Sequence, residues 1–352
     1  MLKPFVAVAV GAASTALAIA GQPLATAAGD SVGVRVLTTD VAAPFNIHVT
    51  KHGIYYADGV PGIVGKLRKD GSTKTLVARA PGASGVAYRD GKLAYTTTVS
   101  DPETHVNTSS ALHVKGPHRH LRVGTLAYER SHNPDKVNTY GIANPTPCQV
   151  EALGPQARYK GIKDSHAYSV AAWGNKWLVA DAGANAILVV NKRGHIRTLS
   201  VLPPQPTVIT AEAATALELD PECFAGTRYR YEPVPTDVEV KHGRIYVTTL
   251  PGGPESGALG ERGAVYRVAP STGKATLVAR GFAGATNLAV GRHGKIFVTE
   301  LFGGRISTVV DGKIRNYVEL PGAIAVEKRD RGLWGSTLDL TFQGPGSIVR
   351  FN

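Results

Sequence analysis

The 352-residue sequence carries 39 Lys and Arg against 27 Asp and Glu, a formal net charge of +12, and it contains 40 glycines, 22 prolines and two cysteines. This much glycine and proline is typical of an all-β chain that turns often. Beyond the N-terminal segment, no apolar run approaches the ~20 residues of a membrane helix, which excludes a transmembrane segment in the rest of the chain.

The N-terminus has the pattern of a secretory signal peptide. Lys3 supplies positive charge, Phe5 to Ala20 is an unbroken run of small apolar residues, and Ala25-Thr26-Ala27 fits the small-residue rule for cleavage. The run is short and poor in Leu and Ile for a membrane span, and a retained anchor is the alternative. We expect residues 1–27 to be removed, leaving 28–352 as one secreted, extracellular domain and a monomer.

A strand precedes the first repeat and predicts how the fold closes. Residues 32–37 alternate valine with other residues, and the chain ends in Ser347-Ile348-Val349-Arg350-Phe351. We predict that residues 32–37 pair with the unit built from about Ala323 to Phe351, because one seam of a closed ring otherwise lacks covalent support.

Six repeats follow, each an apolar strand, a tight turn and a second apolar strand. One copy is Thr236 to Val240, the turn His242-Gly243, and Arg244 to Thr248. Repeats of ~40–50 residues made of short strands are typical of a β-propeller. We therefore predict an all-β, six-bladed, NHL-like β-propeller, with an ordinary β-sandwich as the alternative. The repeats begin near Phe45, Val86, Val170, Thr236, Thr286 and Ile324.

The basic excess suggests that an exported chain contacts anionic polymers, cell-wall phosphates or lipid headgroups. Nucleic acid is not expected in that compartment. The densest basic stretch looks like an outer hairpin, and its charges are better explained as a solvated edge that resists edge-to-edge pairing. The stretch contains Lys115, His118, Arg119, His120 and Arg122.

Two insertions, about 127–164 and 203–235, break the strand rhythm. The first begins with a short predicted helix that Asn133-Pro134 stops. The second contains a helix-like run from Thr210 to Leu217, with Thr210 as its N-cap. Long insertions of this kind are often functional lids, and a structural strut is the alternative.

One cysteine lies in each insertion. In an exported protein an even pair predicts a disulfide between Cys148 and Cys223. A reactive or metal-binding thiol pair is the alternative, but no Cys-x-x-Cys spacing supports it. The bond would staple both insertions into one cap over a propeller face.

Several segments resemble the ScyD/ScyE family, over roughly Ala42 to the C-terminus. The segments are Tyr128-Glu129 to Asn133-Pro134-Asp135, Asp164 to Tyr168, Val179 to Asn185, Val234 to Val238, Tyr246 to Pro254 and Gly281 to Leu288. The resemblance implies an exported, NHL-like six-bladed propeller whose biochemical role is not established. Where members commonly have Asp-Ser-Asn-Pro-Tyr, this chain has His166-Ala167.

Alignment of the repeats places one residue of each innermost strand at the mouth of the central channel. These residues are Asn46, Gly85, Ser169, Asp237, Asn287 and Ala323, and those before them are Phe45, Ser84, Tyr168, Thr236, Thr286 and Gly322. We predict a ligand site at this mouth, under the stapled insertions. Polar residues that merely cap strand ends are the alternative. The predicted ligand-binding residues are Asn46, Ser84, Tyr168, Ser169, Thr236, Asp237, Thr286 and Asn287.

Tyrosines in the insertions are candidates for the same binding surface, since amphipathic side chains are common there. The alternative is that they pack the insertions onto the propeller. The tyrosines are Tyr128, Tyr140, Tyr159, Tyr229 and Tyr231. Acidic residues at the ends of second strands are expected to be structural turn acceptors instead: Asp58, Asp181 and Glu300.

A catalytic alternative rests on the architecture of six-bladed lactonases, which hold a divalent metal in such a ring. Asp237, Asn46 and Asn287 would bind Ca²⁺ or another divalent cation in a metal-dependent lactonase or esterase, with Asp237 as ligand or base. One carboxylate is few for Ca²⁺, and neither a Gly-x-Ser-x-Gly nor a His-Glu-x-x-His motif appears. The sequence therefore favours a non-catalytic protein that binds a small molecule, polymer or protein without a cofactor.

Overall fold

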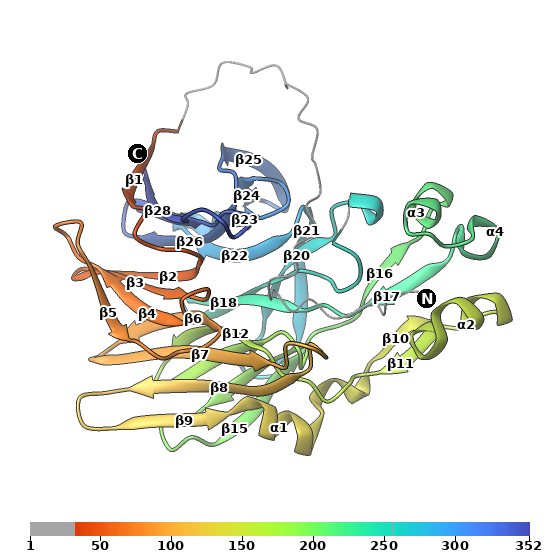
Figure 1. Ribbon diagram of the computed structural model, residues 1–352, viewed down its shortest axis with the longest axis horizontal. Coiled ribbons are helices and arrows are strands. Elements are labelled where there is room, and N and C mark those ends of the chain that lie inside the picture. Colours follow the sequence, from red (N-terminus) through yellow and green to blue (C-terminus); the bar gives the residue numbers. More distant parts are fainter. Residues whose placement is uncertain (1–31, 256) are drawn as a thin grey trace.

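The computed structural model describes residues 32–255 and 257–352, and strands dominate this part of the chain (Figure 1). The strands form seven four-stranded sheets, with short helices between them. Neighbouring strands are antiparallel throughout the described residues. The prediction of an all-β chain with short helices in its insertions agrees with this structure.

Three of the sheets come from the first two-thirds of the chain. Sheet 1 contains β2 (Pro44–Thr50), β3 (Gly53–Asp58), β4 (Ile63–Leu67) and β5 (Thr73–Val77). Sheet 2 contains β6 (Ala83–Arg89), β7 (Lys92–Ser100), β8 (Asn107–Lys115) and β9 (His120–Gly124). Sheet 3 contains β12 (Ala167–Trp173), β13 (Lys176–Asp181), β14 (Ala186–Val190) and β15 (Ile196–Val201).

Three more sheets follow the same plan. Sheet 4 contains β18 (Pro235–Lys241), β19 (Arg244–Thr249), β20 (Gly263–Val268) and β21 (Ala275–Phe282). Sheet 5 contains β22 (Ala285–Val290), β23 (Ile296–Glu300), β24 (Arg305–Val310) and β25 (Lys313–Glu319). Sheet 6 contains β26 (Ala323–Arg329), β27 (Gly332–Thr337), β28 (Ser347–Phe351) and β1 (Val34–Thr38).

The first strands of these sheets surround a central axis. β2, β6, β12, β18, β22 and β26 contact one another in this order, and β26 contacts β2 again. Such a cycle of inner strands is the arrangement of a β-propeller. Below, the start end is the end of the axis where first strands begin, and the turn end is the end where they turn into second strands.

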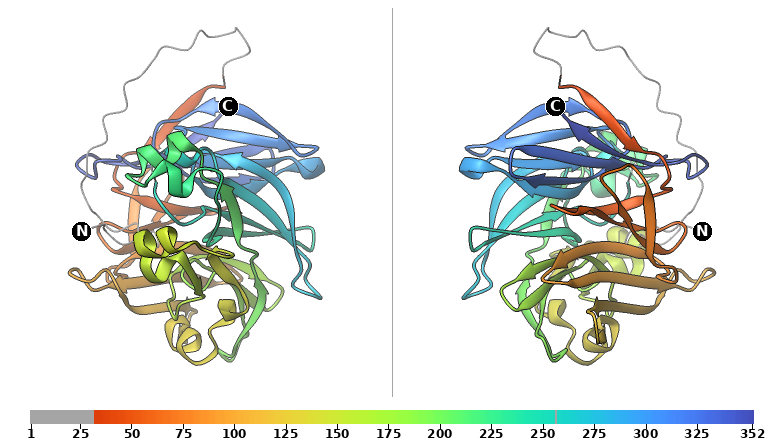
Figure 2. Two further views of the ribbon diagram at one scale, coloured as in Figure 1. Left: turned by 90° about the vertical axis from the view of Figure 1, so that its right-hand side faces the viewer. Right: turned by 90° about the vertical axis from the view of Figure 1, so that its left-hand side faces the viewer.

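The expected closure is confirmed. β1 pairs antiparallel with β28, with Val34 opposite Phe351 and Val36 opposite Val349. The Asn352 amide also donates to the Gly33 carbonyl at 3.0 Å. Sheet 6 is therefore built from both ends of the described chain, and the red and dark blue segments lie side by side in both views of Figure 2.

Turn chemistry explains why the strand pairs form where they do. Asp90 and Gly91 between β6 and β7 have φ of 49° and 74°. Positive φ at both central residues defines the type I′ turn, whose twist matches that of a hairpin and which favours Asp-Gly. His242-Gly243 between β18 and β19 follows the same pattern, with φ of 50° and 73°.

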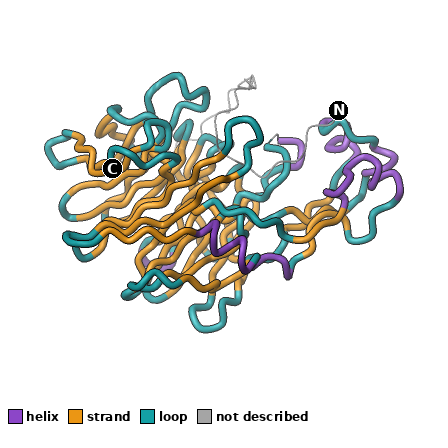
Figure 3. The backbone as a smooth tube through the Cα atoms, turned by 60° about the horizontal axis from the view of Figure 1, so that its bottom comes forward, coloured by secondary structure: helices purple, strands orange, loops and turns teal. Residues whose placement is uncertain are grey.

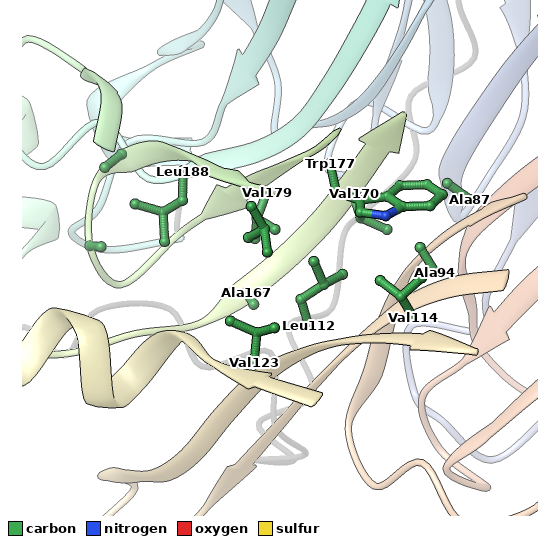
Figure 4. Close-up of a cluster of buried hydrophobic side chains, with 13 residues drawn as sticks. Ala87, Ala94, Leu112, Val114, Val123, Ala167, Val170, Trp177, Val179 and Leu188 are labelled. Carbon is green, nitrogen blue, oxygen red and sulfur yellow. The ribbon is translucent and has the colours of Figure 1, made fainter. Parts of the chain in front are cut away.

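Apolar side chains between neighbouring sheets form the core. Between sheets 2 and 3, Leu112 and Val123 pack with Val170, Val179 and other buried residues (Figure 4). The residues alternate along their strands, so each face contributes every second side chain. At ~25 cal/mol per Å² of buried apolar surface, such clusters are the main source of stability.

The two insertions form a further sheet together, which the sequence did not predict. The first supplies β10 (Thr139–Ile142) and β11 (Arg158–Lys160), and the second supplies β16 (Gln205–Val208) and β17 (Arg228–Tyr231). Their order is β11-β10-β17-β16, so β10 joins β17 across the two insertions. This insertion sheet projects from the start end, on the right of Figure 1.

Several helices lie beside the insertion sheet, on the right of Figure 3, whereas the short helix Arg292–Gly294 lies in the turn between β22 and β23. The predicted helices are present as α1 (Thr125–His132) and α3 (Ala211–Ala216), and the Thr210 hydroxyl accepts from the Ala213 amide as an N-cap. The others are α2 (Pro147–Leu153), α4 (Pro221–Phe224), η1 (Pro134–Val137), η2 (Gly154–Ala157), η3 (Gly257–Leu259) and η4 (Arg292–Gly294). In the described residues, no helix is long and apolar enough to cross a bilayer.

The predicted disulfide is confirmed. Cys148 on α2 is bonded to Cys223 on α4, with the two Cα atoms 6.2 Å apart and a sequence separation of 75. Gln149 beside it donates to the Cys223 carbonyl and to the Thr227 hydroxyl, both at 2.9 Å. The staple thus joins the two insertions as expected. The signal-peptide prediction lies outside the described residues.

Candidate functional site

The residues predicted to ring the channel mouth form a buried belt near the start end. None of the eight has more than 7% of its surface exposed. Below, "polar belt" means Asn46, Ser84, Tyr168, Ser169, Thr236, Asp237, Thr286 and Asn287. In sheet 6 the equivalent residue is Ala325 opposite Ser336, so the predicted position at Ala323 was wrong by two residues.

Two belt side chains hold the edge of the next sheet. Asp237 accepts from the Leu288 amide at 3.0 Å and from the Ser169 hydroxyl, while Asn287 Oδ1 accepts from the Val326 amide at 2.9 Å. A first strand is the inner edge of its sheet, so the amides on its free side need acceptors from elsewhere. The belt supplies them.

The belt hydroxyls do the same for carbonyl groups. Thr236 donates to the Ala285 carbonyl at 2.9 Å, Thr286 donates to the Ile324 carbonyl at 2.9 Å, and Ser84 donates to the Ala167 carbonyl at 3.2 Å. Each bond crosses from one sheet to another. These contacts support the alternative in which the polar residues cap strand ends, and the predicted ligand site there stays a prediction.

The belt residue Tyr168 lies close to a second aromatic ring. Phe45 from sheet 1 and Tyr168 from sheet 3 lie with ring centroids 6.5 Å apart. Tyr168 is buried with Ala182 and Val234, and burial raises the pKa of its hydroxyl. An apolar contact therefore forms at the predicted channel mouth.

The belt does not fit a Ca²⁺ site. Asp237 uses both of its oxygens and Asn287 uses its Oδ1 in the hydrogen bonds described above. Ca²⁺ takes 6–8 oxygen ligands, usually including several carboxylates. Within 32–255 and 257–352, no three His, Cys, Asp or Glu side chains are arranged around one metal. We derive no chemistry through a metal at the belt.

A charged cluster that the sequence analysis missed lies further along the axis. His48, Glu239 and Glu327 stand two residues after the belt position on their strands. Glu239 accepts from the Val290 amide at 2.6 Å, and His48 Nδ1 lies 3.4 Å from Glu327 Oε1. Side chains two residues apart on a strand point to the same face. A count of two residues from the belt position would therefore have found His48, Glu239 and Glu327 in the sequence.

Burial sets the charge of this cluster. It lowers the pKa of His48 to about 4 and raises that of Glu327 to about 8, and the pKa of Glu239 is raised as well. Asp237, whose pKa burial raises to about 6, adds to the shift at Glu327, while Lys241 and Arg329 oppose it. Burial therefore favours the uncharged forms of His48, Glu239 and Glu327.

Basic residues dominate the turn end. The six turns between first and second strands (50–53, 89–92, 173–176, 241–244, 291–295 and 328–332) contain eleven Lys and Arg but only two acids, Asp90 and Asp330. Below, "basic turn face" means these eleven: Lys51, Arg89, Lys92, Lys176, Lys241, Arg244, Arg292, Lys295, Lys328, Arg329 and Arg331. The excess equals most of the formal net charge of the chain, +12.

Two cavities open on the basic turn face. One of about 280 Å³ lies between sheets 5 and 6 and is lined by Arg292, Lys295, Lys328 and Arg331 together with Phe297 and Asp330. The other, of about 510 Å³, lies among sheets 1, 2 and 6 and is lined by His48 and Arg329, among others. Arg329 Nη1 is buried there without a hydrogen-bond partner among the described residues.

Acids gather at the start end instead. Asp58 accepts from the Ala43 amide at 2.7 Å, and Glu300 accepts from the Ala283 amide at 2.7 Å. Asp181 accepts from the His166 amide at 2.8 Å. These bonds confirm that the three acids are turn acceptors.

The insertion tyrosines pack the insertions rather than line a surface. Tyr140, Tyr229 and Tyr231 are buried, at 0–6% exposure. Tyr140 donates to Asp135 at 3.0 Å, and the Tyr128 hydroxyl lies 3.0 Å from that of Thr198 on β15. The packing alternative is therefore correct for these four residues. Tyr159 stacks at a tilt on Tyr140, with ring centroids 5.5 Å apart.

Comparisons with known proteins show the fold and not the family. No family model and no curated sequence matches this chain, so the ScyD/ScyE resemblance stays a prediction. A proposed oxidoreductase (glucose dehydrogenase) from Thermus thermophilus is 16% identical, with 92% of this chain and 100% of that one covered and a TM-score of 0.54.

Two further solved structures are similar. A proposed gluconolactonase is 10% identical, with 92% of this chain and 93% of that one covered and a TM-score of 0.52. A streptogramin B lyase is 13% identical, with 91% and 98% covered and a TM-score of 0.50. At such identities the likeness supports the β-propeller fold alone.

Proposed function

We propose that this chain is an exported, non-catalytic, six-bladed β-propeller that binds a phosphate-bearing anionic polymer on its basic turn face. The closed cycle of six first strands supports the blade count. The Cys148–Cys223 disulfide supports export, since disulfides persist in oxidising compartments. The ligand site proposed here lies at the opposite end of the axis from the predicted channel mouth.

The charge of the six turns is the observation that carries the proposal. Burial lowers the pKa of Lys328, and the charges of Arg292 and Lys241 lower it further, so turns from sheets 4, 5 and 6 act on one another. Like charges held together destabilise the fold unless an anion is bound. A purely structural role does not explain why these positive charges lie together at the turn end of the axis.

Phosphodiesters fit the chemistry of this face. Arg binds phosphate oxygens through two parallel N–H bonds, and Lys binds them as a point charge. The cavity between sheets 5 and 6 offers both residue types around the Phe297 ring. A repeating polymer can contact several turns at once, which multiplies weak contacts.

The test compares two charge reversals of equal size. Arg244→Glu, Arg292→Glu and Arg331→Glu together change three exposed turn residues. Lys115→Glu, Arg119→Glu and Arg122→Glu change the exposed outer hairpin by the same charge. Inorganic polyphosphate is the probe, measured by titration calorimetry, with phosphatidylglycerol vesicles as a second arm.

We expect polyphosphate to bind the wild-type chain and the hairpin variant alike, and the turn variant at least 10-fold more weakly. Binding should weaken strongly between 50 and 500 mM salt, because the contacts are exposed charges. Equal losses in both variants would mean that net charge alone attracts the polymer. Binding to vesicles but not to polyphosphate would place a lipid headgroup at the face instead.

The lactonase alternative has less support. It rests on a fold shared at 10% identity with a proposed gluconolactonase, and the belt oxygens that would bind a metal are engaged within the fold. Metal-dependent turnover of a simple lactone that Asp237→Asn abolishes would reinstate it.

A further inference from the structure

Five carboxylates meet where the insertions join sheet 3. They come from α1, η1, the end of β13, the loop before β12 and the residue after β17. Below, "acidic junction" means Glu129, Asp135, Asp164, Asp181 and Glu232. The charges of Asp135, Asp164 and Asp181 all act on Glu129, and those of Asp135 and Asp164 also act on Glu232.

No basic side chain neutralises the junction directly. Among the described residues, none of the five carboxylates forms an ion pair. The charges of Lys163 and Arg130 reach Glu129 and Asp164 respectively, but only at a distance. A group of buried carboxylates without a counter-charge must bind protons or a cation.

Hydrogen bonds within the fold account for most of the carboxylate oxygens. Asp181 accepts from Ser165 at 2.7 Å, and Asp164 accepts from Asn107 at 3.0 Å. Asp135 Oδ2 accepts from Tyr140 at 3.0 Å and from Asn185 at 2.9 Å. These residues have a role in the fold that needs no ligand.

In the part of the chain that the structure describes, the carboxylate of Glu129 has no such hydrogen bonds. Only 1% of it is exposed, and neither of its carboxylate oxygens has a hydrogen-bond partner in the described chain. Asn133 Oδ1 and Asp135 Oδ1 are buried and unpartnered there too. Of the eight buried polar side-chain atoms without a partner in the described residues, four thus lie within seven residues, and all four are oxygens.

The backbone holds these oxygens in place. Asn133 caps α1 in the left-handed region, with φ 42°, and its Nδ2 donates to the Gly161 carbonyl at 2.9 Å, which leaves its Oδ1 as the free atom. Gly161 admits the Asp135 carboxylate, because a Cβ there would lie 1.8 Å from Asp135 Oδ1. The unpartnered oxygens are therefore fixed by α1, η1 and the loop that packs on them.

We propose that the acidic junction binds a calcium-type divalent cation, with Glu129 as the principal ligand and oxygens of Asn133 and Asp135 beside it. Hard cations of this type take carboxylate, amide and peptide oxygens in flexible geometry, and water fills the remaining positions. Since no three His, Cys, Asp or Glu side chains in the described residues surround one metal position, the protein would supply two carboxylates and one amide, and water the other ligands. The absence of sulfur and imidazole from this set excludes a preference for Zn²⁺.

Such an ion would act as a second staple. It would tie α1 to η1 within the first insertion, which the Cys148–Cys223 bond joins to the second insertion. The proposal is independent of the basic turn face, which lies at the other end of the axis.

The experiment measures metal content and thermal unfolding of the full mature chain. After treatment with EDTA, we expect added CaCl₂ at 1 mM to raise the unfolding temperature by about 4 °C or more, with a smaller effect of MgCl₂, since ligands that bind only the folded state stabilise it. Glu129→Gln should abolish this shift. Without calcium it should be at least as stable as the wild type, because it removes an unpaired buried carboxyl.

The controls separate this site from others. Glu151→Gln, on the exposed surface of α2, and Asp237→Asn, in the belt, should both keep the calcium shift. Asn133→Gly removes one ligand oxygen while keeping the left-handed backbone, and it should weaken calcium binding by about 10-fold even if Glu129→Gln does not fold. No shift with Ca²⁺, Mg²⁺ or Mn²⁺ in the wild type would overturn the proposal, and so would a shift that Glu129→Gln retains.

Discussion

At the scale of single residues, Asp237 shows what a buried carboxylate does at an inner strand edge. It accepts from the Leu288 amide of sheet 5 and the Ser169 hydroxyl of sheet 3, so one side chain joins three sheets. Leaving a buried donor without its acceptor costs about 1–3 kcal/mol, and more when a charged acceptor is lost.

We therefore expect Asp237→Ala to lower the free energy of unfolding by about 2–4 kcal/mol. Urea denaturation followed by fluorescence measures this directly. Glu103→Ala on an exposed loop is the matched control and should change stability by less than about 0.5 kcal/mol. A loss below about 1 kcal/mol for Asp237→Ala would show that the belt is not a latch between sheets.

Glu327 gives the chain a pH dependence whose sign is fixed. Burial raises its pKa in the folded protein from 4.5 to about 8. Folding therefore favours the protonated form of Glu327. The stability that comes from this preference is complete below about pH 4.5, the pKa in the unfolded chain, and is lost as the pH rises through about 8, the pKa in the folded protein. Glu327→Gln should remove the contribution of this group to the pH dependence of the free energy of unfolding between pH 5 and 9.

Urea midpoints at pH 5.5, 7 and 9 test this expectation. The variant should gain stability relative to the wild type as pH rises, whereas Glu222→Gln on the exposed start of α4 should follow the wild type at every pH. Parallel wild-type and Glu327→Gln curves would show that Glu327 titrates as an ordinary exposed acid.

At the scale of elements, the insertion sheet depends on pairing between two distant segments. β10 and β17 come from different insertions, and the disulfide between α2 and α4 closes a loop of 75 residues beside them. In the chain-entropy model, a loop of this length contributes roughly 4–5 kcal/mol.

We expect Cys148→Ser with Cys223→Ser to open the insertion sheet while sheets 1 to 6 stay folded. Limited proteolysis should then cut within residues 125–166 or 202–234, and the intact wild type should resist. The unfolded, unreduced wild type should titrate with no free thiol. Two free thiols, or unchanged resistance of the variant, would contradict the stapling role.

Local signals predicted the strand pairs and failed for the insertions. Asp90-Gly91 and its equivalents fix hairpins within a few residues, so the repeat pattern could be read from the sequence alone. β11 has three residues and β10 has four, and β10 also pairs with β17 of the other insertion, so no local periodicity marks these strands.

A candidate site could be predicted from the sequence only where its residues occupy equivalent positions in the repeats. The belt residues came from aligned repeats, with an error only in sheet 6, where Ala325 occupies the position. The acidic junction could not be assembled, because Glu129, Asp164 and Asp181 come from separate elements that only the fold brings together. Each residue of the basic turn face could be read from the sequence. The prediction did not take into account that the six turns lie at one end of the propeller axis.

At the scale of the whole molecule, charge is separated along the axis. The basic turn face lies at one end, while the acidic junction and the turn acceptors Asp58, Asp181 and Glu300 lie at the other. An anionic ligand approaching in low salt is steered toward the turn end by such a field. The two ends can thus serve an anion and a cation without competing.

The closing strand gives a prediction for the whole molecule. A chain that begins at Thr39 lacks β1 and leaves β28 as an unprotected edge. We expect it to unfold at a lower temperature and to aggregate at concentrations where a chain beginning at Val32 stays monomeric. Light scattering during a thermal scan compares the two, and identical curves would show that β1 is dispensable.

The pairing of β1 with β28 also sets an order of events during synthesis. Val34 and Phe351 are neighbours in the sheet but are separated by about 300 residues in the chain, which makes this contact among the slowest to form. β1 emerges from the ribosome long before its partner exists, and until then the ring stays open with an apolar seam exposed. This fold can therefore be completed only after β28 has been made, and a chain stalled before Ser347 leaves β1 without its partner and β27 with a free edge.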